Sequence, residues 1–406
     1  MQDVMGTVYM KLGLYRKADT LLRQAVEIRR RILGTNNAQT LNSMDTLGEI
    51  LGSESLYPEA EKWLRETLDG RRRLLGAQHR DTLKAMSHLA TLMNSEGHFS
   101  DAEKINREAL ETAKQVFGPE DLLVTDVSRN LAIDLAYEGK STEAEKEFRQ
   151  VLATGLRVHG AGHPRVIVDT NNLGAILQHM ERYSEADKVY SEAIQSARKV
   201  LGPEHPDTLM LMGNLGQTLT HEQRYAEAAK LLREVFDVKR RTLGPENRST
   251  LVTAGNLAEA LRLTNQLREA EELIRQNLSI EQRVLGPRHS DTLTVAEILG
   301  DLLKSENRYS EAEKVDRQVF EGRREVLGPD HRDTASAAYK LACVLALEGK
   351  KEESLPNLQF AIEHPLSKLY RLEIEQKPDF KTLRGDPRFE AILASSRQRI
   401  AAQKPK

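Results

Sequence analysis

The chain has 406 residues, of which 59 are basic and 61 acidic, so its formal net charge is only −2. This balance argues against attraction of the whole chain to nucleic acid or to an anionic membrane, because both attract proteins through an excess of positive charge. Hydrophobic residues make up 39% and aromatic residues 5%, which is little aromatic mass for one large core and typical of helices packed through Ala and Leu. Length alone suggests two or three domains.

Cysteine content and the N-terminal sequence bear on the compartment. The single cysteine, Cys343, leaves no intrachain disulfide and favours a reducing compartment, so we expect a cytoplasmic protein. The first residues lack the basic segment and the apolar stretch of a signal peptide. The longest purely apolar run, residues 341–347, is too short to span a bilayer, so no contact with a membrane is expected.

A 42-residue repeat organises the chain, and three columns of residues keep its spacing without a slip. One column is a glycine, one is a leucine followed by Gly or Ala, and one is an alanine. The glycines are Gly34, Gly76, Gly118, Gly160, Gly202, Gly244, Gly286 and Gly328, and the leucines are Leu47, Leu89, Leu131, Leu173, Leu215, Leu257, Leu299 and Leu341. Chance does not keep three columns in register over eight copies.

The copy at residues 202–244 predicts two helices joined by a short turn. Apolar residues recur at helical spacing after Pro206, which blocks continuation of the linker, and Asp207 is the expected capping residue. The second helix is expected from Tyr225 to Leu243, with an apolar stripe on one face. A single hairpin cannot bury its stripe, so consecutive hairpins are expected to stack into a solenoid.

These columns resemble the tetratricopeptide repeat, in which a Leu-Gly or Leu-Ala pair, an aromatic residue before the second helix and a central alanine recur. Examples here are Leu215-Gly216, Tyr225 and Ala228. The 42-residue period and the linker pattern LG-P-x-H-P-D-T-L are similar to the kinesin-light-chain subtype of that family. The resemblance implies an all-α, right-handed superhelix (an α-solenoid) of about nine helix hairpins over residues 1–363.

Both ends depart from the period. The first copy has Met5-Gly6 where later copies have Leu-Gly, so its first helix is expected to be truncated, as in a piece of a larger signalling protein. Residues 364–406 are expected to form capping helices and a short tail, with Leu383, Phe389 and Ile392 covering the last apolar stripe. The stretch 377–393 is also similar to tails that close repeat arms in bacterial multidomain signalling proteins.

Motifs that imitate catalytic or metal sites fall on the repeat itself. His-Arg-Asp at residues 79–81 and 331–333 imitates a protein-kinase catalytic loop, but no Gly-rich phosphate loop or DFG accompanies it. Cys343 lies among Ala and Leu and is expected to be a small core residue. We therefore expect no catalytic site, no metal and no cofactor. The linker histidines occur one per repeat, too far apart to share a metal ion, and are His79, His163, His205, His289 and His331.

The second helices are acidic in their first turn and basic in their last. Glu59 and Glu269 stand at such starts, and residues 71–73 and 239–241 are basic clusters at such ends. This distribution compensates the helix dipole, which is the favoured explanation, and a ridge for an acidic partner is the alternative. No aromatic residues are interleaved with the basic ones, so nucleic acid is not expected as a partner.

Polar side chains of the first helices are the candidate binding residues, because the resemblance implies a concave groove lined by first helices that holds peptide segments. An Asn amide both donates and accepts, so it suits a peptide backbone, although it could equally bridge neighbouring helices. The side chains expected to point inward are Arg129, Asn171, Gln217, Glu259, Arg262, Glu297, Asp301 and Lys304, with Asn130, Asn172, Asn214 and Asn256 as an adjacent ladder.

The sequence therefore predicts a non-catalytic scaffold that binds peptide segments of partner proteins in its groove. One alternative is a regulatory or docking arm separated from a signalling enzyme, a kinase or an NTPase, encoded upstream. Another is a self-associating structural solenoid, in which the unfinished first repeat stacks on another molecule.

Overall fold

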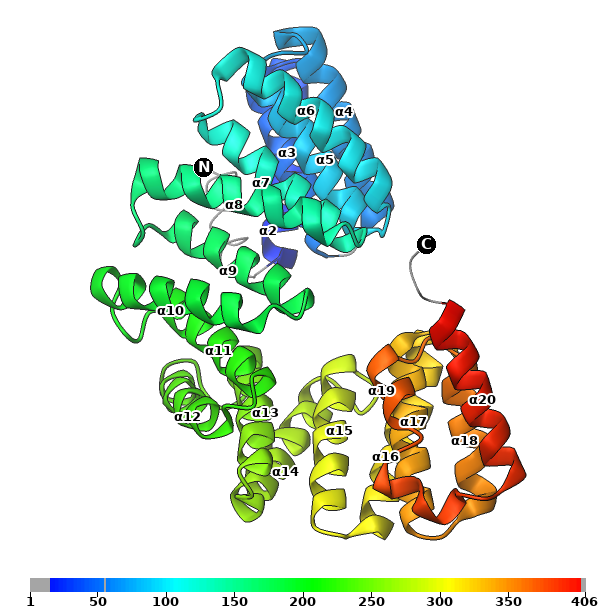
Figure 1. The fold of residues 1–406 in the computed structure, drawn as a ribbon. Coiled ribbons are helices and arrows are strands. Elements are labelled where there is room, and N and C mark those ends of the chain that lie inside the picture. The colour runs from blue at the N-terminus through cyan, green and yellow to red at the C-terminus, as the bar shows by residue number, and fades with distance from the viewer. Residues whose placement is uncertain (1–14, 55, 403–406) are drawn as a thin grey trace. The chain divides into compact units, whose positions relative to one another are not determined.

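The computed structural model describes residues 15–54 and 56–402. The chain divides into two compact units, residues 1–214 (unit 1) and residues 215–406 (unit 2). Within the described residues every regular element is a helix. Each unit is built from antiparallel helix hairpins, so the predicted all-α solenoid of hairpins is confirmed (Figure 1).

The first described helix of unit 1 is α2, the second helix of the first copy, and complete hairpins follow it. Each first helix of these hairpins has 16 residues and each second helix has 18 or 19. The predicted truncation at Met5-Gly6 lies outside the described residues. The helices are α2 (Tyr15–Leu33), α3 (Ala38–Ser53), α4 (Tyr57–Leu75), α5 (Arg80–Ser95), α6 (Phe99–Phe117), α7 (Leu122–Tyr137), α8 (Ser141–His159), α9 (Pro164–His179) and α10 (Tyr183–Val200).

Helix α11 (Pro206–His221) begins before the division between the units and ends after it. Helix α12, expected at Tyr225–Leu243, covers Tyr225–Thr242, one residue less than predicted. The other helices of unit 2 are α13 (Arg248–Leu263), α14 (Leu267–Val284), α15 (Ser290–Ser305), α16 (Tyr309–Leu327), α17 (Arg332–Leu347), α18 (Lys351–Glu363), α19 (Lys368–Glu373), the 3₁₀ helix η1 (Pro378–Leu383) and α20 (Pro387–Ala402).

A linker side chain caps each first helix. The prediction that Asp207 caps α11 is wrong, because the backbone N–H of Asp207 donates to Nδ1 of His205, two residues earlier, at 3.2 Å. The linker histidines are therefore N-caps, and each must keep Nδ1 unprotonated to accept this bond. The same bond is made in every described linker, by Asn37, His79, Asp121, His163, His205, Asn247, His289 and His331.

From the α5–α6 hairpin to the α17–α18 hairpin, the turn between the two helices contains a left-handed residue. Gly97 and Gly139 both provide it with φ of 83°. At the same register, Glu181 has φ of 59° and Gln223 has φ of 62°. Such values carry a steric penalty for a residue with a Cβ, so these two turns are strained where the glycine turns are not.

Arginine–glutamate pairs join successive second helices. Arg107 donates to Glu143 at 2.8 Å and Arg233 donates to Glu269 at 2.9 Å, and in both pairs the partners are 36 positions apart in the sequence. The acidic first turns thus bind the preceding hairpin in addition to compensating the helix dipole, and they help to fix the register of stacking. The same pair recurs at Arg23–Glu59, Arg149–Glu185, Arg275–Glu311 and Arg317–Glu353.

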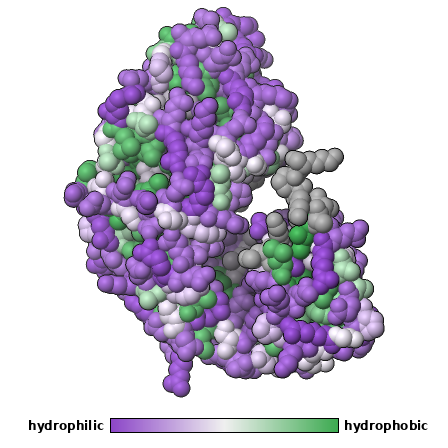
Figure 2. All heavy atoms as spheres, in the orientation of Figure 1, coloured by the Kyte–Doolittle hydropathy of each residue, from purple (hydrophilic) through white to green (hydrophobic). Residues whose placement is uncertain are grey.

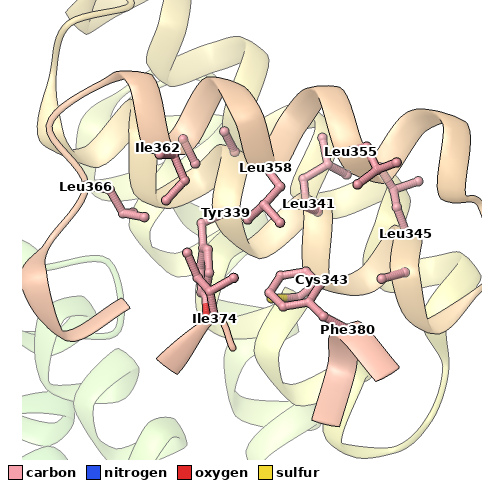
Figure 3. Close-up of a cluster of buried hydrophobic side chains, with 14 of the residues drawn as sticks. Tyr339, Leu341, Cys343, Leu345, Leu355, Leu358, Ile362, Leu366, Ile374 and Phe380 are labelled. Carbon is pink, nitrogen blue, oxygen red and sulfur yellow. The ribbon is translucent and has the colours of Figure 1, made fainter. Parts of the chain in front are cut away.

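The tail of unit 2 closes the apolar stripe of the last hairpin, as predicted (Figure 3). Phe380 of η1 lies edge-on to Tyr339 of α17, with ring centroids 5.9 Å apart. The expected cap residues Leu383, Phe389 and Ile392 are all buried in the same cluster. Asp386 accepts from the backbone N–H of Arg388 at 2.9 Å and caps α20. Cys343 is buried here, and burial raises the pKa of its thiol.

Candidate functional site

In each unit the candidate site is the surface formed by that unit's first helices, called here the first-helix face. Consecutive first helices contact one another, as α3 does α5 and α5 does α7 in unit 1, and α13 does α15 in unit 2. Polar side chains of adjacent hairpins can therefore meet on this face. The structure places every predicted site residue on it, but pairs many of them within the chain.

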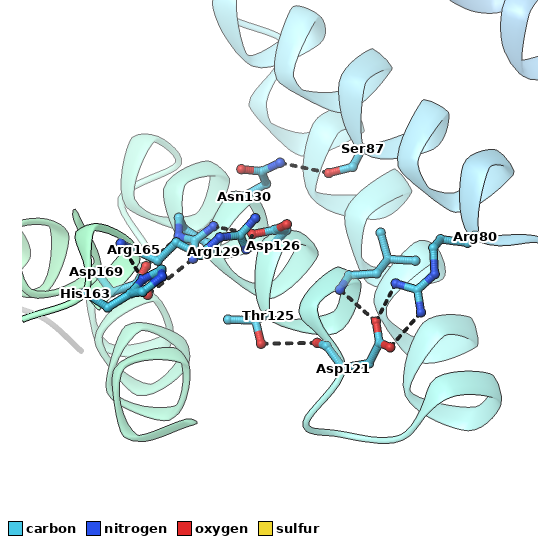
Figure 4. Close-up of polar contacts among 11 residues, drawn as sticks. Arg80, Ser87, Asp121, Thr125, Asp126, Arg129, Asn130, His163, Arg165 and Asp169 are labelled. Carbon is cyan, nitrogen blue, oxygen red and sulfur yellow. Dashed lines mark hydrogen bonds and ion pairs between the residues drawn. The ribbon is translucent and has the colours of Figure 1, made fainter. Parts of the chain in front are cut away.

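Arg129 joins α7 to α9 (Figure 4). Its Nε donates to Asp169 at 2.5 Å and its Nη1 donates to Asp126 at 2.7 Å. The side chain of Arg129 is 15% exposed and that of Asp169 is 1% exposed. Burial opposes the guanidinium charge, but the two carboxylates outweigh it and raise the pKa of Arg129. Arg129 is thus engaged within the chain before any partner binds.

Two members of the asparagine ladder bridge neighbouring helices. The amide nitrogen of Asn130 donates to the Ser87 hydroxyl at 2.9 Å, joining α7 to α5 (Figure 4). The amide nitrogen of Asn214 donates to Oδ1 of Asn171 at 2.5 Å, joining α11 to α9. For these two asparagines the structure therefore shows a bridge between neighbouring helices, one of the two roles that the sequence left open.

Asn172 has no hydrogen-bond partner among the described residues and borders a hollow between α7 and α9. Phe148 forms an apolar base that is 2% exposed, and Tyr137 is 65% exposed. A mainly apolar hollow with one amide at its edge fits an apolar side chain next to a peptide group. The hollow has a volume of about 680 Å³ and is lined by Ile133, Ala136, Tyr137, Gly139, Phe148, Asn172, Ala175, Ile176 and His179.

The site residues at the start of unit 2 are partly paired. Within the described part of the chain, Gln217 and Asn256 are half-buried and have no hydrogen-bond partner. Glu259 accepts from Nε and Nη2 of Arg262 at 2.8 and 2.6 Å. Arg262 also donates to the Ser305 hydroxyl of α15 at 3.2 Å, so this pair links two first helices.

Residues of α17 and of the tail pair with the predicted site residues at the end of unit 2. Nζ of Lys304 lies 3.4 Å from Oδ2 of Asp379 in η1. Glu297 and Asp301 both pair with Lys340 of α17, at 2.6 and 2.5 Å. All three residues that the sequence predicted to point inward here are therefore satisfied by intramolecular ion pairs.

The hollow between α7 and α9 was not predicted from the sequence, although the size of the side chain at one register indicates it. Asn94 and Gln178 fill the corresponding space in their hairpins, where Asn94 donates to Asp134 at 2.7 Å and Gln178 donates to the Asn214 carbonyl at 3.1 Å. Ala136 stands at the same register, 42 residues from each, and is too short to reach α9.

Metal binding and membrane insertion are the remaining functional classes. Over residues 15–54 and 56–402, no group of three His, Cys, Asp or Glu side chains is arranged to hold a metal ion. Over the same stretch, no helix combines the length and apolar character needed to cross a membrane. Figure 2 shows mainly hydrophilic side chains on the face drawn, with hydrophobic ones in small groups.

The 42-residue hairpins and their columns agree with one family of repeats. Its profile, described as tetratricopeptide repeat, matches residues 1–69, 47–115, 166–241, 212–279 and 249–325, and a second profile of the same description matches residues 128–165. The chain belongs to the tetratricopeptide-repeat family. A search of curated proteins gives no match to this tetratricopeptide-repeat (TPR) chain.

Several solved TPR-like structures are similar to this chain. A putative kinesin light chain with nearly identical TPR-like repeats, from Podosopora anserina, is among them. It is 23% identical, with 51% of this chain and 98% of that chain covered and a TM-score of 0.47. The apo form of the quorum sensor NprR from B. thuringiensis is 17% identical, with 89% and 99% covered and a TM-score of 0.60. The apo form of RapI is 11% identical, with 92% and 98% covered and a TM-score of 0.63.

Proposed function

We propose that the first-helix face of unit 1 binds an extended segment of a partner protein, and that the chain acts as a non-catalytic scaffold. Stacked TPR hairpins are typical of protein–protein interaction, because they present long continuous surfaces. An apolar side chain of the partner enters the hollow between α7 and α9. The Asn172 amide pairs with a peptide group next to that side chain.

The observation that carries this proposal is the unpaired amide of Asn172 beside an apolar hollow. Isoleucine side chains of α7 and α9, Ile133 and Ile176, line the hollow above the ring of Phe148. A partner that covers this surface removes water from the amide, and leaving it unpaired then costs free energy. A peptide group supplies both the donor and the acceptor that the amide needs.

One further observation favours unit 1 as the binding region, and a second supports a binding role for the chain as a whole. The tail engages Lys304 through Asp379, so the end of unit 2 is already covered by the chain itself. The similar protein NprR is described as a quorum sensor and was solved in an apo form. We also place the chain in the cytoplasm, since its one thiol, Cys343, suits a reducing compartment.

The proposal is tested with peptides selected from a random display library on the immobilised chain, each then measured by fluorescence anisotropy. Ala136→Gln inserts the side chain that Gln178 has at the same register and closes the hollow. Asn172→Ala removes the unpaired amide. Val252→Gln is the matched control, because Val252 lies exposed on a first helix of unit 2.

We expect either unit 1 substitution to weaken peptide binding by about tenfold, with an unchanged melting temperature, and the control to bind normally. Unchanged affinity in both unit 1 variants overturns the proposal. The regulatory-arm and self-association alternatives stay predictions. The first is tested by the reading frame upstream, and the second by light scattering against concentration.

A further inference from the structure

A second hollow lies on the first-helix face of unit 1, between α3 and α5. Leu64 and Leu92 are buried and form its apolar base. The hollow exists because Gly52 has no side chain. At the same register of the next hairpin, the Asn94 side chain fills the corresponding space. The hollow has a volume of about 320 Å³ and is lined by Gly48, Glu49, Gly52, Ser53, Leu64, His88, Thr91, Leu92 and Ser95.

The hydroxyl groups of this hollow are acceptors. Ser53 donates its proton to the Glu49 carbonyl at 3.0 Å, Thr91 donates to the Ser87 carbonyl at 3.0 Å, and Ser95 donates to the Thr91 carbonyl at 3.1 Å. A hydroxyl has one proton and two lone pairs, so each oxygen can only accept from a ligand while its proton is held by the helix. The polar part of the lining therefore selects a hydrogen-bond donor.

A carboxylate adds negative charge at the same place. Nε2 of His88 lies 3.2 Å from Oε1 of Glu49, and Nδ1 of His88 lies 3.1 Å from Oδ1 of Asp45. Arg71 binds Asp45 from the other side at 2.9 Å. Oε2 of Glu49 has no partner among the described residues. Burial raises the pKa of Glu49 against the opposing charge of His88, so a further cation that reaches Oε2 would stabilise the ionised carboxylate.

We propose that the hollow between α3 and α5 binds the side chain of a lysine or arginine from the partner segment. This inference rests on the proposed function, because the cation belongs to the same segment that occupies the α7–α9 hollow. The ammonium or guanidinium group donates to Glu49 and to the hydroxyl oxygens. The methylene stem packs on Leu64 and Leu92, as long basic side chains do on apolar surfaces.

The lining distinguishes this occupant from others. An anion would meet hydrogen-bond acceptors and a carboxylate in this hollow. A wholly apolar side chain would leave Oε2 of Glu49 and three hydroxyl oxygens without water or a donor. A free polyamine has the same charged group, but it lacks the peptide backbone that continues along the first-helix face.

The test uses small probes whose binding does not depend on the α7–α9 hollow. N-acetyl-lysine methylamide, N-acetyl-arginine methylamide, the uncharged N-acetyl-norleucine methylamide and spermidine are titrated into the chain labelled at leucine methyl groups. The NMR shifts of Leu64 and Leu92 report on the hollow. Lysine and arginine probes are expected to give saturable shifts at both residues, and norleucine none.

Three variants complete the design. Glu49→Gln keeps an acceptor for His88 and removes the charge, and we expect it to weaken the lysine probe at least fivefold. Gly52→Asn introduces the side chain present at residue 94 and is expected to abolish the shifts. Glu108→Gln, which removes an exposed charge on α6, is the matched control and is expected to bind the probe normally.

The outcomes that would overturn the inference are the following. Equal shifts with norleucine, or an unaffected Glu49→Gln variant, overturn the inference. Tighter binding of spermidine than of the lysine probe assigns the hollow to a free polyamine and also overturns it. Library peptides that bind through Asn172 but are indifferent to Glu49→Gln leave the proposed function standing without this inference. If the lysine probe binds but the library selection yields no binding peptide, both the proposed function and the assignment of the cation to a partner segment are refuted.

Discussion

The side-chain amide of Asn130 donates to the Ser87 hydroxyl, whereas Asn172, one repeat later at the same register, bonds to no described residue. Two asparagines of one sequence column therefore have different roles. We expect Asn130→Ala to lower the free energy of unfolding by about 1 kcal/mol and Asn172→Ala to change it by less than about 0.5 kcal/mol. Urea unfolding measures both, and equal losses would contradict the assignment.

The linker histidines are expected to matter as caps. His205→Ala removes the acceptor for the backbone N–H of Asp207 and should lower the free energy of unfolding by about 1 kcal/mol. His205→Asn should restore most of it, because Asn37 and Asn247 make the same bond in other linkers. Thermal unfolding of the two variants checks this, and equal losses would refute the capping role.

The left-handed turn at Glu181 predicts a stabilising substitution. Glu181→Gly relieves a steric penalty of about 1–2 kcal/mol, against roughly 0.5–1 kcal/mol of extra chain entropy lost by glycine on folding, so a gain of up to about 1 kcal/mol is expected. Gly97→Glu at the same register is the reciprocal change and should destabilise. Denaturant midpoints measure both, and a loss in Glu181→Gly would show that its side chain stabilises the turn.

Replacing Asp316 is expected to raise the free energy of unfolding by an amount that depends on pH. Asp316 is 4% exposed, lies at the register of Leu64 and Leu232, and packs against Gly300. Burial, with the nearby charge of Asp301, raises the pKa of Asp316 to about 8. The folded chain therefore keeps a proton that the unfolded chain has lost, so this residue lowers stability increasingly as pH rises from about 4 to about 8.

Replacing Asp316 removes that cost. Asp316→Leu should raise the free energy of unfolding, and the gain should grow with pH by at most about 1.4 kcal/mol per unit up to about pH 8, and then level off. Asp316→Asn should show the same pH trend without the added apolar contact. Unfolding measured at pH 5, 7 and 9 provides the profile. A gain independent of pH would show that Asp316 is ionised in the folded chain.

The hairpins were predictable because the repeat is written in the sequence as columns at a fixed spacing. Helix α12 starts at Tyr225 as expected, and Leu383 and Phe389 cap the last hairpin as expected. The pairing of Arg129 with Asp169, 40 residues away, was not predictable, since helical periodicity gives the direction of a side chain but not its partner on the next hairpin. The hollow at Ala136 arises because a small residue replaces the larger Asn or Gln of the neighbouring hairpins. A small residue carries no chemical signal of its own in the sequence.

The small residues at one register, Gly52 and Ala136, allow specificity to change one hairpin at a time. Asn94 and Gln178 show that larger polar residues at this position leave the hairpin stack intact. Opening or closing a hollow therefore takes a single codon and leaves the packing between the two helices of the hairpin untouched. An array of this kind can acquire new recognition sites gradually, because the side chain at this register can change in one hairpin without changing the others.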